Sequence, residues 1–474
     1  MSIDTTHGGG TKKDPMIDVS QRRYQVIGTA WLAWFVNYID RTKTAALLPL
    51  ITASLAMDTG QTGSVLFAFF IGYAAIQPLA GFLTDLVGAK KTLALSVAAF
   101  SIFTWTMALV GNWQELFIRN LLFGLSQGFE VTAGSRLAAT WFPPATRGRA
   151  FGFHQTAYTI APIFAPFIAV PIAQATGSWR WSFMVVAFFG LPVLAAIDHF
   201  VSDRPERDPR TSQAELEYIF GEDAHKRGSV LDPARATTEA ELPPGERPTP
   251  YREIFLNRSV ALMFVAGFFG LLATWGLTTW LPTYGVQQLK LPLIIAGSLS
   301  SIVFAGSLVG VLAGGYLSDK VFGTKRTPIW LFGGVVMAAA ILWATTFQPG
   351  APLIEMYAAF FIAGLAASMS PTGQLFAPYL AELLTPGAVG RSLGVVVLGG
   401  MIGSAVAQPL VAALVIQTPA GPQFWPAFVM FAACGVVTTV CVAFMIEPRV
   451  HRTYLGYLLA GRKEGKWQPS PASA

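Results

Sequence analysis

Long apolar stretches alternate with short polar segments along most of the chain, from about residue 22 to residue 448. An α-helix needs about 20 predominantly apolar residues to cross a hydrocarbon core about 30 Å thick. Twelve stretches have about this length: residues 24–48, 62–84, 91–111, 115–138, 150–173, 181–201, 257–281, 294–318, 328–347, 353–377, 391–415 and 424–446. The pattern predicts an all-α membrane protein with twelve transmembrane helices.

Three polar segments frame these stretches. They are residues 1–21, 202–254 and 448–474, and the middle one separates the first six stretches from the last six. We therefore expect two helical domains, residues 22–201 and 255–447, joined by a linker. In the linker, TSQAELEYIFGEDA favours a short amphipathic helix at the membrane surface, although a disordered tether is an equal alternative.

Composition and charge fit this picture. The hydrophobic set makes up 53% of the chain and charged residues only 12%, which excludes an ordinary soluble domain of this size. If the N-terminus is cytoplasmic, the outer loops hold only Arg180 and Lys290. The inner loops then hold the other loop cations: Lys12, Lys13, Arg22, Arg23, Lys90, Lys91, Arg147, Arg149, Lys320, Lys325, Arg326 and Arg391. Because cationic loops resist translocation, this predicts a multi-pass protein of the cell membrane with both termini cytoplasmic. The net charge of +6 reflects this topology and does not indicate a nucleic-acid partner.

A short motif occurs once in each half. GFLTDLVGAKK follows the second stretch, and GYLSDKVFGTKR follows the eighth. The shared positions are Gly81, Asp85, Lys90 and Lys91 in the first copy and Gly315, Asp319, Lys325 and Arg326 in the second. We expect the glycines to let helices approach closely, and the charges to pair at the inner interface and hold a gate shut.

This doubled signature in a twelve-span chain resembles the Major Facilitator Superfamily. The resemblance implies two six-helix bundles that rock around a central cavity by alternating access. NYIDR, WFPPATRGRA, GSWRWSF and WLPTY are together similar to the anion:cation symporter branch, whose members carry organic anions, usually with protons. It implies a monomeric transporter with no cofactor other than a co-transported proton. The fifth stretch lacks the Gly-rich pattern of drug-proton antiporters, which argues against an exporter.

The stretch NYIDRTK places three charges inside the first predicted span. Asp40 and Lys43 are three residues apart and can pair, whereas Arg41 lies about 100° around the helix and is left over. Asn37 and Tyr38 lie on its side, and a substrate carboxylate would satisfy the guanidinium. By resemblance, Arg41 is the substrate ligand and Asp40 titrates. In the alternative, all three charges form a structural network with the fourth span; the role of Lys43 stays open.

The fourth stretch departs from the family pattern. Gln127 stands where many members have a proton-accepting Glu, and Asn120 where they often have a second substrate Arg. Arg119 and Glu130 lie nearby, eleven residues apart, so a continuous helix would put them on one face. Either Glu130 has taken over the titrating role, with Asp40 as its partner, or coupling is lost and the protein is a facilitator or exchanger.

Resemblance and position suggest five further pocket residues: Tyr73, Gln77, Tyr158, Trp275 and Val397. Sugar-acid relatives often have Asn at the position of Val397. An unpaired sugar hydroxyl in a buried site costs about 1 to 3 kcal/mol. The pocket therefore favours a less hydroxylated monoanion, aromatic or short aliphatic, over a hexuronate.

Other classes fit less well. A transporter-like nutrient receptor usually carries a long soluble domain, and the polar C-terminal segment has only about 25 residues. Cys434 and Cys441 lie seven apart in the last span and are expected to be packing residues. We find no metal cluster, nucleophile elbow or phosphate-binding loop in the sequence, so neither an enzyme nor a metal site is expected.

Overall fold

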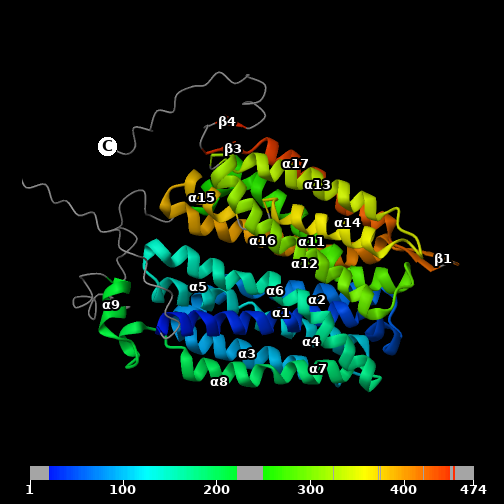
Figure 1. The fold of residues 1–474 in the computed structure, drawn as a ribbon, viewed down its shortest axis with the longest axis horizontal. Coiled ribbons are helices and arrows are strands. Elements are labelled where there is room, and N and C mark those ends of the chain that lie inside the picture. Colours follow the sequence, from blue (N-terminus) through cyan, green and yellow to red (C-terminus); the bar gives the residue numbers. More distant parts are fainter. Residues whose placement is uncertain are drawn as a thin grey trace, which may run out of the picture.

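The computed structural model describes residues 21–220, 249–323, 325–371, 373, 375–419, 421–448 and 452–453. These residues form two helical bundles that lie side by side (Figure 1). The N-terminal bundle consists of α1 (Arg22–Ser54), α2 (Thr59–Val87), α3 (Ala89–Met107), α4 (Trp113–Gln127), α5 (Glu130–Trp141), α6 (Pro144–Thr176), α7 (Trp179–Phe188) and α8 (Gly190–Phe200). The predicted tail at residues 1–20, most of the tail after residue 448 and residues 221–248 of the predicted linker lie outside this description.

The C-terminal bundle repeats this architecture. It consists of α11 (Arg258–Gln287), α12 (Leu293–Tyr316), the π-helix η6 (Leu317–Val321), α13 (Thr327–Ala344), α14 (Leu353–Ser368), α15 (Phe376–Leu383), α16 (Pro386–Leu414) and α17 (Trp425–Ala443). The described linker contains η1 (Pro205–Arg207), α9 (Gln213–Phe220) and α10 (Tyr251–Leu256). The short strands β1 (Ile416–Thr418) and β2 (Gly421–Gln423) form a hairpin between α16 and α17, and β3 (Ile446–Glu447) pairs with β4 (Arg452–Thr453).

The predicted twelve-span, all-α fold is confirmed. Among the described residues, eight helices or helix pairs are long and apolar enough to cross a membrane, and α14 is a shorter apolar helix. The other three predicted spans coincide with α1, α3 and the pair α4–α5. Side chains cap the turns between spans: at α2, Asp58 accepts from the Gln61 backbone N–H at 2.7 Å while the Gln61 side chain accepts from the Asp58 N–H.

The fourth span is not one continuous helix, which corrects the sequence-based expectation. It breaks after Gln127 into α4 and α5, with Gly128 at the C-cap of α4 and Phe129 at the N-cap of α5. Beside it, Gly72 of α2 and Gly124 of α4 are so close to the opposite backbone that an added Cβ would overlap a carbonyl group. The pair α2 and α4 thus packs at small-residue distance, and the break turns α5 toward α1 and α6.

The two motif copies differ by one residue, and a π-turn absorbs the difference. Gly88 follows Asp85 after three positions, whereas Gly323 follows Asp319 after four. The extra residue widens the last turn of the helix into η6, where the Phe322 N–H donates to the Leu317 carbonyl at 3.0 Å. Both glycines then turn the chain at positive φ, +95° and +57°.

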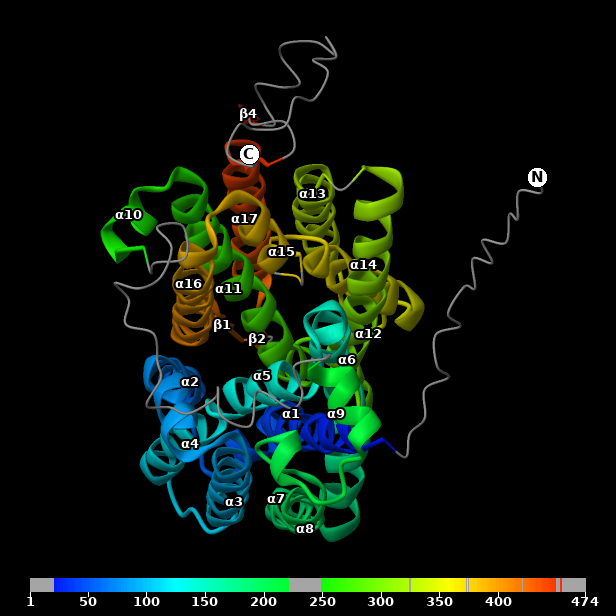
Figure 2. The same cartoon turned by 90° about the vertical axis from the view of Figure 1, so that its left-hand side faces the viewer.

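We name the two ends of the molecule for what lies there. The linker end holds the start of α1 and the end of α8, and the hairpin end holds β1 and β2. At the hairpin end Gly63 of α2 faces Ala412 of α16, Gly297 of α12 faces Pro166 of α6, and Gln417 donates to Thr59 Oγ1 at 3.1 Å. Figure 2, seen from the linker end, likewise shows α2 beside α16 and α6 beside α12.

At the linker end the motif charges pair within their own bundles. Asp85 pairs with Arg136 of α5, Lys90 lies 3.3 Å from Asp198, and Arg326 lies 2.9 Å from Glu382. Lys91 is exposed, Lys325 donates its N–H to the Phe322 carbonyl, and the Asp319 side chain is outside the description.

The motif glycines Gly81 and Gly315 have no described atom within 4 Å of where a Cβ would stand. The expectation of close approach at these glycines is therefore wrong for this conformation, because the bundles contact each other through their hairpin halves.

The described linker is anchored to the start of α1. Arg22 donates from Nη2 to Asp208 at 2.7 Å, and Arg210 donates from Nε to the same carboxylate at 3.0 Å. The Glu215 carboxylate of α9 accepts the free backbone N–H groups of Arg22 and Arg23, so it caps α1. The predicted helix in the linker is confirmed over α9 (Gln213–Phe220), and residues 221–224 of the predicted stretch lie outside the described residues.

We predict that this anchor weakens in acid. Burial alone raises the pKa of Asp208, but hydrogen bonds from Arg210 and Arg22 outweigh it and lower that pKa to about 2. An unfolded Asp has a pKa of about 3.9, so the stabilisation is complete above pH 4 and is lost as the pH falls toward about 2. Asp208→Asn should destabilise the protein by about 2 kcal/mol at pH 7, with no further loss in acid.

Thermal unfolding of purified protein in detergent at pH 7 and at pH 3 measures this effect. Asp198→Asn is the matched control, because Asp198 forms an exposed ion pair and should change stability by less than about 1 kcal/mol. Equal effects of the two substitutions at pH 7 would contradict the prediction.

Candidate functional site

Aromatic rings surround the guanidinium of Arg41 in the middle of α1. It is 7% exposed. Its Cζ atom lies within 5.3 Å of five ring centroids: Trp275 at 4.1 Å, Phe69 at 4.7 Å, Tyr73 at 5.0 Å, Phe70 at 5.1 Å and Tyr38 at 5.3 Å. Four of these rings belong to the N-terminal bundle and Trp275 to the other. The faces of such rings attract a cation electrostatically. They do not accept the hydrogen bonds that the N–H groups of the guanidinium donate in its own plane.

The guanidinium has unused hydrogen-bond donors. Nη1 donates to the Tyr38 hydroxyl at 3.3 Å, whereas Nε and Nη2 are buried without a partner among the described residues. No described carboxylate pairs with Arg41, so its charge has no counterion in the part of the chain that the structure describes. A buried cation with free donors in a fork geometry is suited to bind an anion, and a carboxylate can fit it by two parallel hydrogen bonds.

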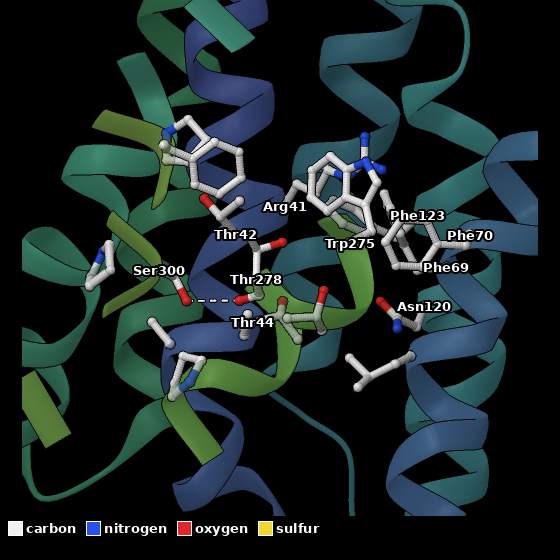
Figure 3. A pocket seen from close by; sticks show the side chains of 18 residues that line it. Arg41, Thr42, Thr44, Phe69, Phe70, Asn120, Phe123, Trp275, Thr278 and Ser300 are labelled. Carbon is white, nitrogen blue, oxygen red and sulfur yellow. Dashed lines mark hydrogen bonds between the residues drawn. The ribbon is translucent and has the colours of Figure 1, made fainter. Parts of the chain in front are cut away.

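Arg41 faces a pocket between the two bundles (Figure 3). The pocket is a narrow space, and the volume in it that protein atoms do not fill, open solvent included, is about 590 Å³. Residues of α1, α2, α4, α6, α11 and α12 line it: Arg41, Thr42, Thr44, Ala45, Ala46, Leu66, Phe69, Phe70, Asn120, Phe123, Pro162, Pro166, Trp275, Thr278, Thr279, Pro282, Ser300 and Phe304. The walls are mainly aromatic and aliphatic, with polar groups at a few points.

Most polar side chains of the pocket are already engaged. Asn120 donates from Nδ2 to the Val65 carbonyl at 2.7 Å, which fixes the orientation of its amide. Ser300 donates to the Thr278 carbonyl at 2.7 Å (Figure 3), and Thr42 donates to the Tyr38 carbonyl at 2.6 Å. These hydroxyls can accept further hydrogen bonds but have no second proton to donate.

Asp40 and Lys43 form an ion pair on the other side of α1, as the i,i+3 spacing predicts. The Asp40 carboxylate also accepts from Thr104 Oγ1 of α3 at 2.6 Å, and Lys43 Nζ donates to the Asp40 carbonyl at 2.8 Å. Neither residue lines the pocket. Arg41 is not joined to this pair, so the structure does not contain the alternative network of all three charges.

Glu130 lies in a second buried polar cluster beside α1. Asn37 donates from Nδ2 to Glu130 Oε2, and Gln127 donates from Nε2 to the Asn37 carbonyl at 3.1 Å. Glu130 Oε1, Gln127 Oε1 and Asn37 Oδ1 are buried without a partner in the described part of the chain. Asn37 thus faces Glu130 rather than Arg41, which corrects its assignment to the Arg41 side.

Arg119 does not share a face with Glu130. Its guanidinium donates to the Thr106 carbonyl and lies 3.4 Å from Glu115, whereas Glu130 is fully buried behind the break between α4 and α5. The expected common face is wrong because the eleven-residue count assumed an unbroken helix.

The structure places the other predicted pocket residues unevenly. Trp275 and Asn120 line the pocket. Tyr73 is one of the five rings around the Arg41 guanidinium, which we call the ring cage. Tyr158 packs its ring against Tyr38 at 5.4 Å and borders a separate small cavity. Gln77 donates to the Gly128 carbonyl at 3.4 Å, and neither it nor Tyr38, Gln127 or Val397 is among the lining residues.

Sequence reasoning missed Phe69, Phe70, Phe304 and the hydroxyls of α11 and α12. A signal was present for two of them, because Phe69 and Phe70 precede Tyr73 by four and three residues and share its helix face. Phe304 and Ser300 come from the opposite bundle, and no local spacing brings them to Arg41.

The sequence model of the Major Facilitator Superfamily matches residues 30–381 and 296–458 of this chain. The chain is 28% identical over 305 residues to a probable sulfoacetate transporter of Cupriavidus necator, covering 64% of this chain and 66% of that one, just under two thirds. It is 26% identical over 372 residues to the hexuronate transporter of Bacillus subtilis, covering 78% and 79%. It is 25% identical over 441 residues to a probable galactarate/D-glucarate transporter of Escherichia coli, covering 90% and 94%.

Solved structures agree on the fold. The xylose transporter XylE from E. coli, in a partially occluded inward open conformation, superposes with a TM-score of 0.66 at 14% identity, covering 95% of this chain and 100% of that one. A D-xylose-proton symporter superposes with a TM-score of 0.68 at 15% identity, covering 90% and 99%.

The two cations in the middle of α1, Arg41 and Lys43, make opposite predictions for stability without substrate. Arg41→Met removes a buried charge that has no described counterion and should stabilise the protein by about 1 to 3 kcal/mol. Lys43→Met, the matched control on the same helix, leaves the Asp40 carboxylate unpaired and should destabilise it by about 3 to 5 kcal/mol. Thermal unfolding in detergent without added anions distinguishes them. A loss of stability in Arg41→Met as large as in Lys43→Met would show that Arg41 has an internal partner.

Proposed function

Because the chain belongs to the Major Facilitator Superfamily, we propose that it is a secondary transporter of small organic anions that works by alternating access around the Arg41 pocket. One observation supports this most: a guanidinium with two unpartnered donors, buried where the two bundles meet. The buried charge of Arg41 destabilises the protein while the pocket is empty, and a bound anion would relieve this cost. The gain in free energy on binding would then arise at the interface about which the two bundles move. The three relatives are named as transporters or probable transporters of organic acids, which supports the same class of substrate.

The pocket favours a monocarboxylate with an aromatic or short aliphatic body. Arg41 is the only cation among its lining residues, so one carboxylate is neutralised there and a second would be left without a partner. Flat walls such as Phe70, Trp275 and Phe304 suit an apolar body. The hydroxyls of Thr42, Thr278 and Ser300 already donate within the protein, whereas Thr44 Oγ1 has no described partner and can still donate. A polyhydroxy acid would therefore find few donors for its own oxygens.

The molecule is in an inward-facing arrangement under this proposal. The cationic loops assign the linker end to the cytoplasm. The bundles meet at the hairpin end, and the pairs Asp85–Arg136 and Arg326–Glu382 lie within single bundles at the other end. In the outward-facing state these motif residues would approach the opposite bundle, and the gate of the doubled motif would close.

Proton coupling is assigned to Glu130. Its carboxyl is fully buried, holds one hydrogen bond from Asn37 and has no described cationic partner. A charged carboxylate in such a place is costly, so proton binding at Glu130 and anion binding at Arg41 would favour one another. The alternative is a facilitator or exchanger, which Gln127 favours because it cannot titrate at the position where many relatives of this branch have Glu. An exporter or a nutrient receptor has no support from the pocket.

The first test is uptake into proteoliposomes from a panel of carboxylates that includes benzoate, lactate, sulfoacetate and glucuronate. We expect saturable uptake of a monocarboxylate. Arg41→Lys keeps the charge but loses the fork, and should weaken binding by about 10- to 100-fold, or roughly 1.4 to 2.8 kcal/mol. Arg119→Lys is the matched control, since Arg119 lies outside the pocket, and should transport normally. Native affinity in Arg41→Lys would refute the site.

The second test concerns Glu130. Glu130→Gln keeps the shape and the Asn37 contact but removes the proton site, so accumulation driven by an imposed pH gradient should be lost while exchange of internal for external anion continues. Accumulation ratio and exchange rate are measured in the same vesicles. Glu115→Gln, at an exposed carboxylate of the neighbouring helix, is the control and should behave as native protein. Normal uphill uptake by Glu130→Gln would exclude the assigned role.

A further inference from the structure

The Asp40–Lys43 pair is a charged cluster that the transport proposal leaves without a role. Its members are 1% and 0% exposed. Lys43 Nζ donates to one carboxylate oxygen of Asp40 and to its backbone carbonyl, and Thr104 Oγ1 donates to the other carboxylate oxygen. Both oxygens of the carboxylate therefore have a donor. The cluster as a whole is neutral while both residues are ionised.

The helices packed around the pair present no other described charge to it. Phe183 of α7 lies with its ring centroid 4.1 Å from Lys43 Nζ, and Phe123 of α4 lies at 5.5 Å. α3 contributes the uncharged Thr104. Each member of the pair is the charged neighbour of the other.

Charged residues further along the same helices are engaged elsewhere. Arg119 of α4 donates to the Thr106 carbonyl and pairs with Glu115. Arg180 of α7 donates to the Val110 carbonyl at 2.7 Å. Arg41, the next charge on α1, faces the pocket.

The pair is also separated from the pocket. Phe123 lines the pocket on one side and contacts Lys43 on the other, so its ring stands between the cavity and the ammonium group. A substrate at Arg41 does not reach Asp40 or Lys43. Charge changes at the pair would therefore have to come from protons alone.

We propose that Lys43 serves as a permanent internal cation for Asp40, in the place that a transported proton would otherwise take, so that Asp40 keeps its charge throughout the cycle. Protonating Asp40 would leave a buried ammonium without its counterion, and removing a proton from Lys43 would leave a buried carboxylate. Either step is disfavoured at every stage. The family resemblance implies that Asp40 binds and releases a proton during transport. With Lys43 three residues later as its partner, Asp40 would instead stay ionised.

One consequence of this inference, the number of protons coupled to transport, rests on the proposed function. With Asp40 held ionised, Glu130 is left as the coupled site, and one proton accompanies one anion. A monocarboxylate moving with one proton carries no net charge, whereas two protons would carry one positive charge. Transport by the native protein is therefore expected to be insensitive to membrane potential.

The test compares native protein, Lys43→Met and the double variant Asp40→Asn with Lys43→Met, in proteoliposomes with labelled lactate as the probe and protein-free vesicles as the blank. The double variant replaces the ion pair by a neutral pair of similar size. Its accumulation under a pH gradient should stay within about twofold of native and should remain insensitive to potential. Lys43→Met frees Asp40 to bind a proton, so an inside-negative potential should now speed its uptake.

A second readout does not depend on transport. Infrared difference spectra between about pH 5 and pH 9 detect the carbonyl band of a protonated carboxyl group. Native protein should show no band that the double variant lacks, and Lys43→Met should show a new one. Should Lys43→Met fail to fold, the comparison of native protein with the double variant still decides.

Three results would overturn the proposal: loss of coupled accumulation in the double variant, a potential-dependent native transport that the double variant abolishes, or a native carboxyl band that disappears with Asp40. If the native protein accumulates neither lactate nor another acid of the panel under a pH gradient, the coupled function fails. The infrared comparison, which does not depend on transport, then tests by itself whether Lys43 keeps Asp40 ionised.

Discussion

The structure depends on one constraint: a charge inside the membrane-spanning bundles must have a partner or a reason to lack one. α1 carries three charges within four residues, and the fold places them in two different surroundings. Asp40 and Lys43 satisfy each other inside the N-terminal bundle, with Thr104 completing the carboxylate. Arg41 is left at the interface between the bundles, among rings and without a described counterion. That difference separates a structural pair from the proposed binding site within one turn of helix.

Helical geometry produces the separation. Residues three apart share a face, whereas neighbours lie about 100° apart, so the pair and Arg41 must point to different surroundings. One surrounding is the closed core between α1, α3, α4 and α7, and the other is the pocket shared with α11 and α12. A single helix thus presents a neutral face to its own bundle and a cationic face to the opposite one. At the proposed binding site the unpaired charge of Arg41 lowers the stability of the fold, and the packing of the rest of the bundle compensates for this loss.

The sequence predicted what repeats or follows from local spacing. The twelve spans, the doubled motif and the Asp40–Lys43 pair could all be read from it, as could the unpaired state of Arg41. It did not predict the break at Gly128, because a glycine in an apolar helical pattern is compatible with a continuous span. The predicted common face of Arg119 and Glu130 was therefore wrong. Of the five rings in the ring cage, those of Tyr38, Tyr73 and Trp275 were among the predicted pocket residues, whereas Phe69 and Phe70 were missed although they share a helix face with Tyr73.

The composition of that cage ties the charge of Arg41 to the movement of the bundles. Four of its rings move with α1, because Tyr38, Phe69, Phe70 and Tyr73 belong to the same bundle. Trp275, the ring with the shortest separation from the guanidinium, belongs to the other bundle. Under the proposed alternating access, a rocking motion would change the contact with Trp275 and preserve the other four. The screening of Arg41 by aromatic surface would then differ between the two states of the cycle, and with it the strength with which Arg41 attracts an anion. In the proposed cycle, a cation held by its own bundle and covered by the opposite one would thus make anion affinity depend on the position of the bundles.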